Sequence, residues 1–259
     1  MTSSQVRWFA ATAAALALGG AAAGSVRAQA PTSGDQVIRA MHDRYAGKWY
    51  KTLTFQQKTT RRTPADTMVI ETWYETAEVP GRLRIDIAPR GGTSYIYAND
   101  SIYVTKKDSV LRRLAGRNPL LILGFDVYGQ PADKTIDVLK EEGFDLGPVH
   151  EDTWEGRPVY VVGAAKGDTT SKQFWVDAND LLFVRSIAAG ARGRTDVRFQ
   201  RYERVKGGWI ATEVLQLLNG RPALREQYAN VQVDVKLDDA YFDPKQWATV
   251  RPGLLYGKP

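Results

Sequence analysis

The sequence contains no cysteine among its 259 residues. Disulfide bridges, thiol nucleophiles and a lipid-modified N-terminal cysteine are therefore excluded, and the fold must be stable through its core alone. Histidine is almost as rare, since only His42 and His150 occur, far apart in the chain. Two separated histidines do not make a metal site without further ligands. We therefore expect neither a metal ion nor another cofactor.

Motifs of catalysis and nucleotide binding are also missing. The sequence has no Gly-x-Ser-x-Gly and no glycine-rich loop that precedes a helix in the phosphate-binding arrangement. Several acids fall at strand or turn positions that predict solvated side chains and no paired catalytic role. These acids are Glu71, Glu75, Asp86, Glu151, Asp152 and Glu155. The sequence therefore indicates a protein that is not an enzyme.

Long apolar runs are missing after the N-terminus. Arg7 is the only charge before the small and apolar residues from Phe9 to Gly24, and small-x-small sites follow. This pattern is typical of a secretory signal peptide, which we predict over residues 1–28 with Ala30 as the alternative last residue. No later segment reaches 18 apolar residues, so no membrane-spanning helix is expected in the mature protein. The interpretation places the protein in the periplasm.

The charge is modest. The formal net charge of +6 falls to +4 with the leader, because the leader removes two arginines and no acid. No basic run is longer than two residues. Such a mild, scattered excess does not favour binding to nucleic acid.

Beyond the leader, the spacing of the apolar residues changes from helical to alternating. Residues 35–45 predict an N-terminal helix, since Val37, Ile38 and Met41 recur at helical spacing. About a dozen strands follow, from 49–58 to 223–235, and short turns favour antiparallel pairing of neighbours. The predicted fold class is mainly β with a few helices (α+β). It is a single curved antiparallel sheet that forms an incomplete β-barrel, in one domain over residues 35–250 with a C-terminal tail over 251–259.

One apolar stretch, Arg117 to Gly129, interrupts the strands. It carries a single acid, Asp126, and Asn118-Pro119 is a typical helix start. A short helix that is apolar on nearly every side must be buried on more than one side. The pattern fits either a core helix or a lid that closes over a cavity. An amphipathic helix over 132–142 follows.

Several strands are apolar on both faces, including 157–164, 172–177 and 209–218. Each such strand needs two covers, or one cover and one ligand. The alternative is a sheet that curls and fills its interior with its own side chains, as small barrels do.

Several segments resemble the periplasmic carriers of outer-membrane lipoproteins, the LolA-like and LolB-like proteins. The resemblance extends over roughly Val37 to Val250. The segments are Thr52–Lys58, Trp73 with Pro80–Ile85, Tyr97–Val104, Asn118–Leu123, Lys172–Asp177 and Tyr241–Pro244. The resemblance implies an incomplete barrel with a helical lid over a hydrophobic cavity that takes lipoprotein acyl chains.

By this resemblance, the cavity and its lid are expected to use twelve apolar residues. They are Leu53, Phe55, Leu83, Ile85, Ile87, Leu120, Leu123, Phe125, Val127, Val159, Val161 and Phe174. The family carries an arginine before the proline that enters the third strand, where it holds the lid closed. This chain has Val79 there, and Arg82 and Arg84 are expected to point away from the cavity because they alternate with Leu83.

The function implied by the resemblance is that of a soluble periplasmic carrier or chaperone in lipoprotein transport. It would bind the acyl chains of lipoproteins, or another lipid, and deliver them towards the outer membrane. Its partners would be an inner-membrane release complex and an outer-membrane acceptor. The alternatives are an envelope sensor or regulatory binding module of the same fold, and a structural β protein with a filled interior.

Overall fold

The computed structural model describes residues 30–88, 92–107 and 109–250. The predicted leader over 1–28 and the predicted tail over 251–259 lie outside the described residues. Within the described ranges, no helix is both long and apolar enough to cross a membrane.

The described strands form one antiparallel sheet of thirteen strands. The order is β6-β5-β4-β3-β2-β1-β13-β12-β11-β10-β9-β8-β7, so neighbours in the sheet are also neighbours in the chain except where β1 pairs with β13. The two outermost strands of this order, β6 and β7, do not pair with each other, and the sheet does not close into a barrel. The predicted fold class is therefore confirmed.

The strands begin and end close to the predicted positions. Their bounds are β1 (Thr52–Arg62), β2 (Met68–Glu78), β3 (Arg82–Ala88), β4 (Thr93–Ala98), β5 (Ser101–Lys106), β6 (Ser109–Ala115), β7 (Val149–Trp154), β8 (Arg157–Val162), β9 (Gln173–Asp177), β10 (Phe183–Gly190), β11 (Gly193–Val205), β12 (Gly208–Leu218) and β13 (Arg221–Val233). The turn at Asn99-Asp100 has φ values of 51° and 53°, the left-handed conformation that a tight hairpin requires.

The helix α1 (Gly34–Tyr45) begins at Ser33, whose hydroxyl accepts a hydrogen bond from the Gln36 N–H. Three further helical pieces, α2 (Pro119–Leu121), η1 (Ile122–Asp126) and α3 (Val127–Gly129), follow one another without a break. We call residues 119–129 the apolar helix. The helix α4 (Ala132–Glu141) comes next and buries Ile136 and Leu139, as its periodicity predicts.

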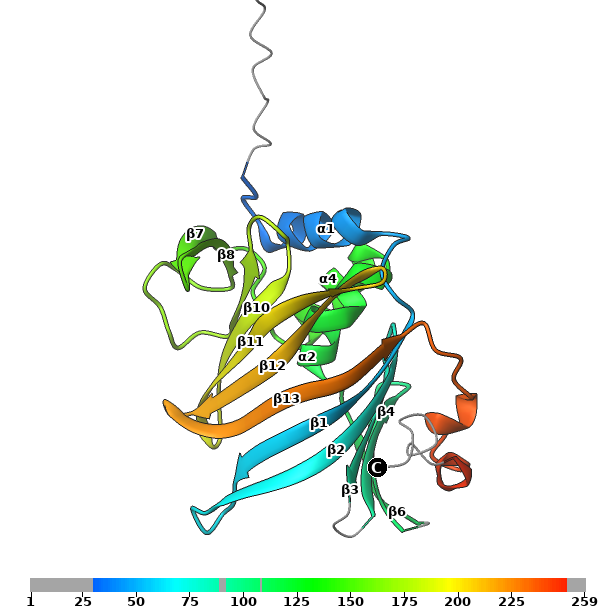
Figure 1. The fold of residues 1–259 in the computed structure, drawn as a ribbon. Coiled ribbons are helices and arrows are strands. Elements are labelled where there is room, and N and C mark those ends of the chain that lie inside the picture. Colours follow the sequence, from blue (N-terminus) through cyan, green and yellow to red (C-terminus); the bar gives the residue numbers. More distant parts are fainter. Residues whose placement is uncertain (1–29, 89–91, 108, 251–259) are drawn as a thin grey trace, which may run out of the picture. The chain divides into compact units, whose positions relative to one another are not determined.

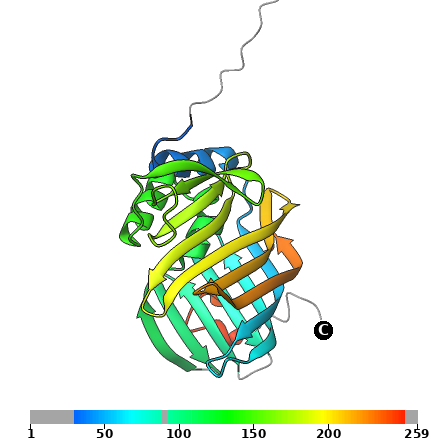
Figure 2. The same cartoon turned by 90° about the vertical axis from the view of Figure 1, so that its left-hand side faces the viewer.

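These helices lie together on the concave side of the curled sheet (Figure 1). Figure 2 shows the yellow and orange strands, β11 to β13, curling across the cyan and teal strands that begin the sheet. The largest buried cluster joins α1, the apolar helix and α4 to β1 and to β9–β12. Two short 3₁₀ helices, η2 (Asp239–Tyr241) and η3 (Trp247–Thr249), are not predicted from the sequence, and Trp247 packs against Ile96 and Ala98 of β4.

Candidate functional site

The apolar helix is built as its sequence predicts at its start and is unusual in its middle. The Asn118 side chain accepts a hydrogen bond from the Leu120 N–H at 3.0 Å, and Pro119 occupies the first turn. The central segment Ile122–Asp126 forms a π turn, a wide turn that often marks functional sites. Gly124 lies in this turn, and a Cβ added there would meet Phe199 of β11 at 3.0 Å. The π turn therefore lets the helix approach the sheet closely.

The apolar helix is both a core element and a wall of a cavity. Leu123, Val127 and Tyr128 are fully buried in the main core. Tyr128 stacks on Trp49 with ring centroids 4.0 Å apart, and its hydroxyl accepts a hydrogen bond from the Phe183 N–H at 2.9 Å. Leu120 and Phe125 are only partly buried and line a cavity instead. The two interpretations of the apolar stretch therefore apply to different sides of one helix.

This cavity lies between the apolar helix and the sheet and has a volume of about 80 Å³. We call it the concave cavity. Six of the twelve residues expected to bind a ligand line it: Leu53, Phe55, Leu83, Ile85, Leu120 and Phe125. They come from β1, β3 and the apolar helix, so the structure brings together residues that are far apart in the sequence. Ligand binding by them stays a prediction.

The other six expected residues do not line the concave cavity. Leu123, Val127 and Phe174 are fully buried in the main core, and Phe174 packs edge-on against Phe144 at 5.6 Å. Ile87 is half-buried near the end of β3. Val159 and Val161 belong to a separate buried cluster with Trp154, Trp175 and Val184. These six residues are thus placed apart from the first six.

Sequence reasoning missed the contribution of the C-terminal strands to the cavity. Its lining also includes apolar residues of β11, β12 and β13: Val197, Phe199, Val214, Leu224 and Tyr228. Tyr228 stacks on Phe55 with ring centroids 4.1 Å apart. The pairing of β1 with β13 brings these residues to the cavity. Alternation along each strand suggested an inward face, but a contact between the first and last strands leaves no local signal.

Two carboxyl groups also line the concave cavity, Glu75 of β2 and Glu226 of β13. Burial raises the pKa of Glu226 to about 7, although hydrogen bonds with Tyr228 and Gln57 lower it. Burial and the charge of Glu226 together raise the pKa of Glu75 well above its usual range. The Tyr228 hydroxyl donates to Glu226 at 2.9 Å. We call Glu75 and Glu226 the carboxyl pair.

The prediction that Glu71, Glu75 and Asp86 are solvated is therefore wrong. Glu71 is 6% exposed and accepts two hydrogen bonds from Arg61, each 2.9 Å long. Asp86 is 9% exposed and accepts two hydrogen bonds from Arg84, on the outer face of the sheet. Glu71 has its partner on the neighbouring strand β1, which the local sequence does not reveal. Asp86 instead pairs with Arg84, two residues away on its own strand β3.

The apolar helix is attached to the β2–β3 turn without an arginine. Val79 is buried, and a Cβ added at Gly129 would lie 3.2 Å from its Cγ1. The Asp126 carboxylate accepts a hydrogen bond from the Gly81 N–H at 3.0 Å. Burial raises the pKa of Asp126 to about 7, against the lowering effects of this hydrogen bond and of the Lys134 charge. Packing and one backbone hydrogen bond thus hold the helix where the carriers are expected to use arginine.

The start of the apolar helix has its own attachment. The Arg117 guanidinium donates to Asp100 at 2.6 Å and to Glu141 of α4 at 2.7 Å. This arrangement ties the residue before the helix to the β4–β5 turn and to the next helix. Arg82 and Arg84 point away from the cavity, as expected, since they contact Asp239 and Trp247 of the C-terminal 3₁₀ helices.

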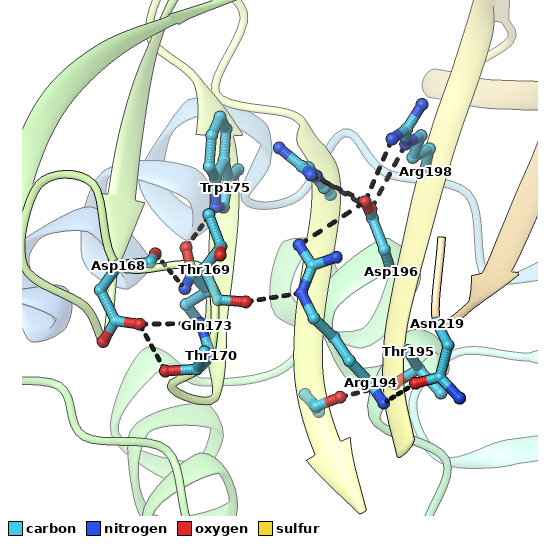
Figure 3. A network of polar contacts seen from close by, with 12 residues as sticks. Asp168, Thr169, Thr170, Gln173, Trp175, Arg194, Thr195, Asp196, Arg198 and Asn219 are labelled. Carbon is cyan, nitrogen blue, oxygen red and sulfur yellow. Dashed lines mark hydrogen bonds and ion pairs between the residues drawn. The ribbon is translucent and has the colours of Figure 1, made fainter. Parts of the chain in front are cut away.

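The outer face of β9–β11 is covered by a polar and aromatic network. The Arg185 guanidinium lies 4.2 Å from the Trp154 ring and 4.5 Å from the Trp175 ring, and it donates to Asp196 at 2.7 and 2.9 Å. Figure 3 shows Asp196 facing Arg198 and Arg194, with contacts of 3.1 and 4.0 Å. The groups of this network pair with one another, so the second apolar face of β8 and β9 has a cover from within the chain.

Other hollows in the described chain have a more polar character. One of about 400 Å³ is lined by Arg44, Lys48, Asp180 and Arg204, among others. Another, of about 260 Å³, lies beside Trp154 and Trp209 and contains both acids and arginines. We regard the concave cavity as the candidate site because its lining is mostly apolar and the apolar helix forms one wall. Nowhere in the described residues do three His, Asp or Glu side chains gather in a way that could hold a metal ion.

No protein-family model matches the chain, and a comparison with curated proteins finds no relative. Solved structures do match. A DUF1329 family protein from Desulfovibrio piger has a TM-score of 0.56 at 17% identity, and the match covers 81% of this chain and 95% of that one. A putative outer membrane lipoprotein-sorting protein domain from Vibrio parahaemolyticus has a TM-score of 0.56 at 11% identity, with 81% and 96% covered.

A LolA superfamily protein from Nitrosomonas europaea is also similar, with a TM-score of 0.49, 13% identity and coverage of 82% and 98%. At such identities a structural likeness concerns the fold alone. The chain has the fold of the lipoprotein-sorting domain and of the DUF1329 protein. The resemblance found in the sequence is confirmed at that level.

Proposed function

We propose that the protein is a periplasmic carrier that binds the acyl chains of a lipoprotein, or of another lipid, in the concave cavity. It would deliver them towards the outer membrane. The observation that carries this proposal is the cavity itself, whose apolar walls come from both the sheet and the apolar helix. The fold of a lipoprotein-sorting domain supports the same function.

The size of the cavity implies that the apolar helix moves on binding. A volume of about 80 Å³ is smaller than the ~150 Å³ of an engineered cavity that binds benzene, and far below the ~300–1,000 Å³ of ordinary ligand pockets. An acyl chain therefore needs a larger space than this form offers. Displacement of Leu120 and Phe125 with the helix would enlarge the cavity. This structure then represents the closed position of the helix.

The energetics predict that the carrier binds acyl chains tightly and that the release of these chains is the difficult step. Burial of an acyl chain contributes about 0.8 kcal/mol per CH₂ group, so two chains provide ample holding strength. A ligand shifts the helix only through its different affinity for the open and closed forms. A donor at the inner membrane and an acceptor at the outer membrane would drive transfer through their own affinities, and the predicted leader brings the protein to the periplasm between them.

The test uses a disulfide that locks the apolar helix in the closed position. Val79 Cγ1 lies 3.2 Å from a Cβ at position 129, so cysteines at both positions would place their sulfurs within bonding range. The chain has no other cysteine to compete. We expect calorimetry to detect dodecanol binding by the reduced Val79→Cys/Gly129→Cys variant and a loss of at least about tenfold in affinity on oxidation.

The two single-cysteine variants are the controls, because oxidation cannot lock either of them. Binding of dodecanol to neither the wild-type protein nor the reduced double variant would contradict the carrier. It would favour the structural β protein with a filled interior. Equal binding by the oxidised and reduced forms would contradict movement of the helix.

A further inference from the structure

The strand β6 ends the sheet and has a neighbour on one side only. It pairs with β5, and no described strand lies beyond it (Figure 1). Every residue of Ser109–Ala115 is exposed. An edge strand presents a row of backbone N–H and C=O groups that can pair with a strand from another molecule. β6 is therefore open to such pairing over its whole length.

This edge is also unusually apolar. Five large apolar side chains are exposed in the described chain, and three of them lie on β6: Val110, Leu111 and Leu114, which are 41–57% exposed. The strand contains no proline and no lysine, two residues that often block an edge. The opposite edge strand, β7, instead has the polar centre His-Glu-Asp-Thr. Exposed apolar groups that gather in one place indicate a surface that binds a partner.

A row of paired residues joins β6 to the concave cavity. Leu83 lines the cavity and lies opposite Tyr97 of β4. Tyr97 lies opposite Ile102 of β5, which in turn lies opposite Leu114 of β6. Residues that lie opposite each other in neighbouring strands share a face of the sheet. Leu114 is therefore on the inner face, and a strand added beside β6 would continue the wall on which the cavity is built.

Arg112 and Arg113 are the only charged residues of β6. Arg112 shares the inner face with Leu114, and Arg113 lies on the outer face, because successive side chains of a strand alternate. The Arg113 guanidinium lies 5.7 Å from the Tyr103 ring and donates to the Ser101 hydroxyl at 3.2 Å. Neither arginine forms an ion pair with an acid of the residues that the structure describes. Each face of this edge thus offers a cation without an acidic partner there.

These two arginines determine which strand fits beside β6. Two copies of the chain that pair their β6 strands antiparallel about the strand centre would place Arg112 of one copy opposite Arg112 or Arg113 of the other. Like charges directly opposite each other destabilise a strand pair, and opposite charges stabilise it. The edge is therefore unfavourable for a second copy and favourable for a strand with one acid on each face. Because side chains alternate, such a strand has two consecutive acids.

We propose that β6 binds an extended segment of a partner protein in which two consecutive acidic residues are flanked by apolar residues. The segment pairs with the free backbone groups of β6 and adds one strand to the sheet. Its acids lie opposite Arg112 and Arg113, and its apolar residues cover Val110, Leu111 and Leu114. This inference goes beyond the proposed function, because it concerns a protein partner and requires no lipid in the concave cavity.

The experiment measures the binding of three peptides with the same fluorescent label by fluorescence anisotropy. The acidic peptide is acetyl-Thr-Val-Glu-Glu-Val-Val-Thr-amide, the basic peptide has Lys-Lys in place of Glu-Glu, and the proline peptide has Pro-Pro in place of Val-Val. We expect the acidic peptide to bind at least about tenfold more tightly than the basic one, because attraction becomes repulsion at two positions. The proline peptide should also bind at least about tenfold more weakly, because proline has no N–H to donate to β6.

The variant Arg112→Glu should weaken binding of the acidic peptide by at least about fivefold and strengthen binding of the basic peptide. Arg112 is exposed, so circular dichroism should remain native, and Arg113→Glu provides a second variant with the same expected effect. The matched control is Arg192→Glu, which makes the same change of charge in the exposed turn between β10 and β11. It should alter the affinity for either peptide by about twofold or less.

Equal binding of the three peptides would show an unselective apolar surface and overturn the proposal. Absence of binding by the acidic peptide would overturn it too, as would an affinity for that peptide that is unchanged in both Arg112→Glu and Arg113→Glu. A dimer in analytical ultracentrifugation from which the acidic peptide is excluded would assign β6 to a second copy, against the proposal. Each of these results leaves dodecanol binding in the concave cavity to be measured separately.

Discussion

At the scale of single residues, three buried or partly buried acids make the described chain sensitive to pH. Asp126, Glu75 and Glu226 all have raised pKa values, chiefly because burial disfavours their charged forms. An acid whose pKa is raised by folding binds more protons in the folded state than in the unfolded state over the interval between the two values. The free energy of unfolding therefore falls as the pH rises through that interval. For Asp126 the interval runs from 3.8 to about 7.

Replacement of Asp126 by asparagine should remove the loss in the free energy of unfolding that ionisation of Asp126 causes as the pH rises. The amide oxygen can still accept the hydrogen bond from the Gly81 N–H, and the side chain can no longer ionise. We expect Asp126→Asn to be more stable than the wild type at pH 8 by on the order of 1–4 kcal/mol, with a much smaller gain at pH 4. Urea unfolding at both values of pH measures the difference.

The matched control is Asp137→Asn, because Asp137 is exposed on the neighbouring helix α4. Its stability should stay within about 0.5 kcal/mol of the wild type at both values of pH. An Asp126→Asn variant that is destabilised equally at pH 4 and pH 8 would show that the carboxylate is charged and stabilising in the folded protein.

At the scale of elements, the apolar helix is the part of the fold that must both pack and move. Its π turn brings Gly124 against Phe199, and Phe199 in turn packs edge-on against Phe183 at 4.8 Å. Because little space remains there, a larger side chain at position 124 must push the helix away from β11. The glycine thus determines how closely the helix seals the concave cavity.

The variant Gly124→Leu should weaken the closed form. We expect a loss of about 1–3 kcal/mol in the free energy of unfolding from overpacking. We also expect tighter binding of dodecanol, because less free energy is then needed to open the helix. The control Gly190→Leu adds the same side chain at the end of β10, where a Cβ would meet nothing within 4 Å. Unchanged dodecanol affinity in a folded Gly124→Leu variant would argue against the helix as the gate.

At the scale of the whole described molecule, the pairing of β1 with β13 joins two series of sequential strands. Leu53 lies at this junction, opposite Val233 and Ala77, and is fully buried in the cluster that includes residues of both series. A shared core predicts that the two series unfold together, as one cooperative domain. The single domain expected over residues 35–250 can be tested on this basis.

The variant Leu53→Ala should lower the free energy of unfolding by about 2–5 kcal/mol and leave a single transition. Far-ultraviolet circular dichroism and tryptophan fluorescence should give coincident urea midpoints. Leu111→Ala is the control, because Leu111 is 57% exposed, and its effect should stay within about 0.5 kcal/mol. Two separate transitions would show that the two series of strands are independent units.

The inner face of a strand could be predicted where only one of its faces is apolar, and could not where both faces are apolar. Alternation along β3 correctly placed Leu83 and Ile85 on the inner face and Arg82 and Arg84 on the other. Alternation along β8 separated Val159 and Val161 from their neighbours but left open which face is inner. In the structure, the face that carries Val159 and Val161 is covered by Trp154 and Trp175, whose rings stack against Arg185. A two-faced strand has no local property that identifies its inner side.

The sequence by itself determined the class of fold, the strand bounds to within a few residues, the capped start at Asn118-Pro119 and the absence of cysteine chemistry. These features depend on local periodicity, turn residues and composition, which a linear chain displays directly. Only the tertiary structure decided which residues meet across the pairing of β1 with β13. That contact joins Phe55 to Tyr228 and brings Glu75 near Glu226 inside an apolar cavity. Its physical basis is long-range strand pairing, whose partners are set by the packing of the whole sheet and leave no signature in either strand alone.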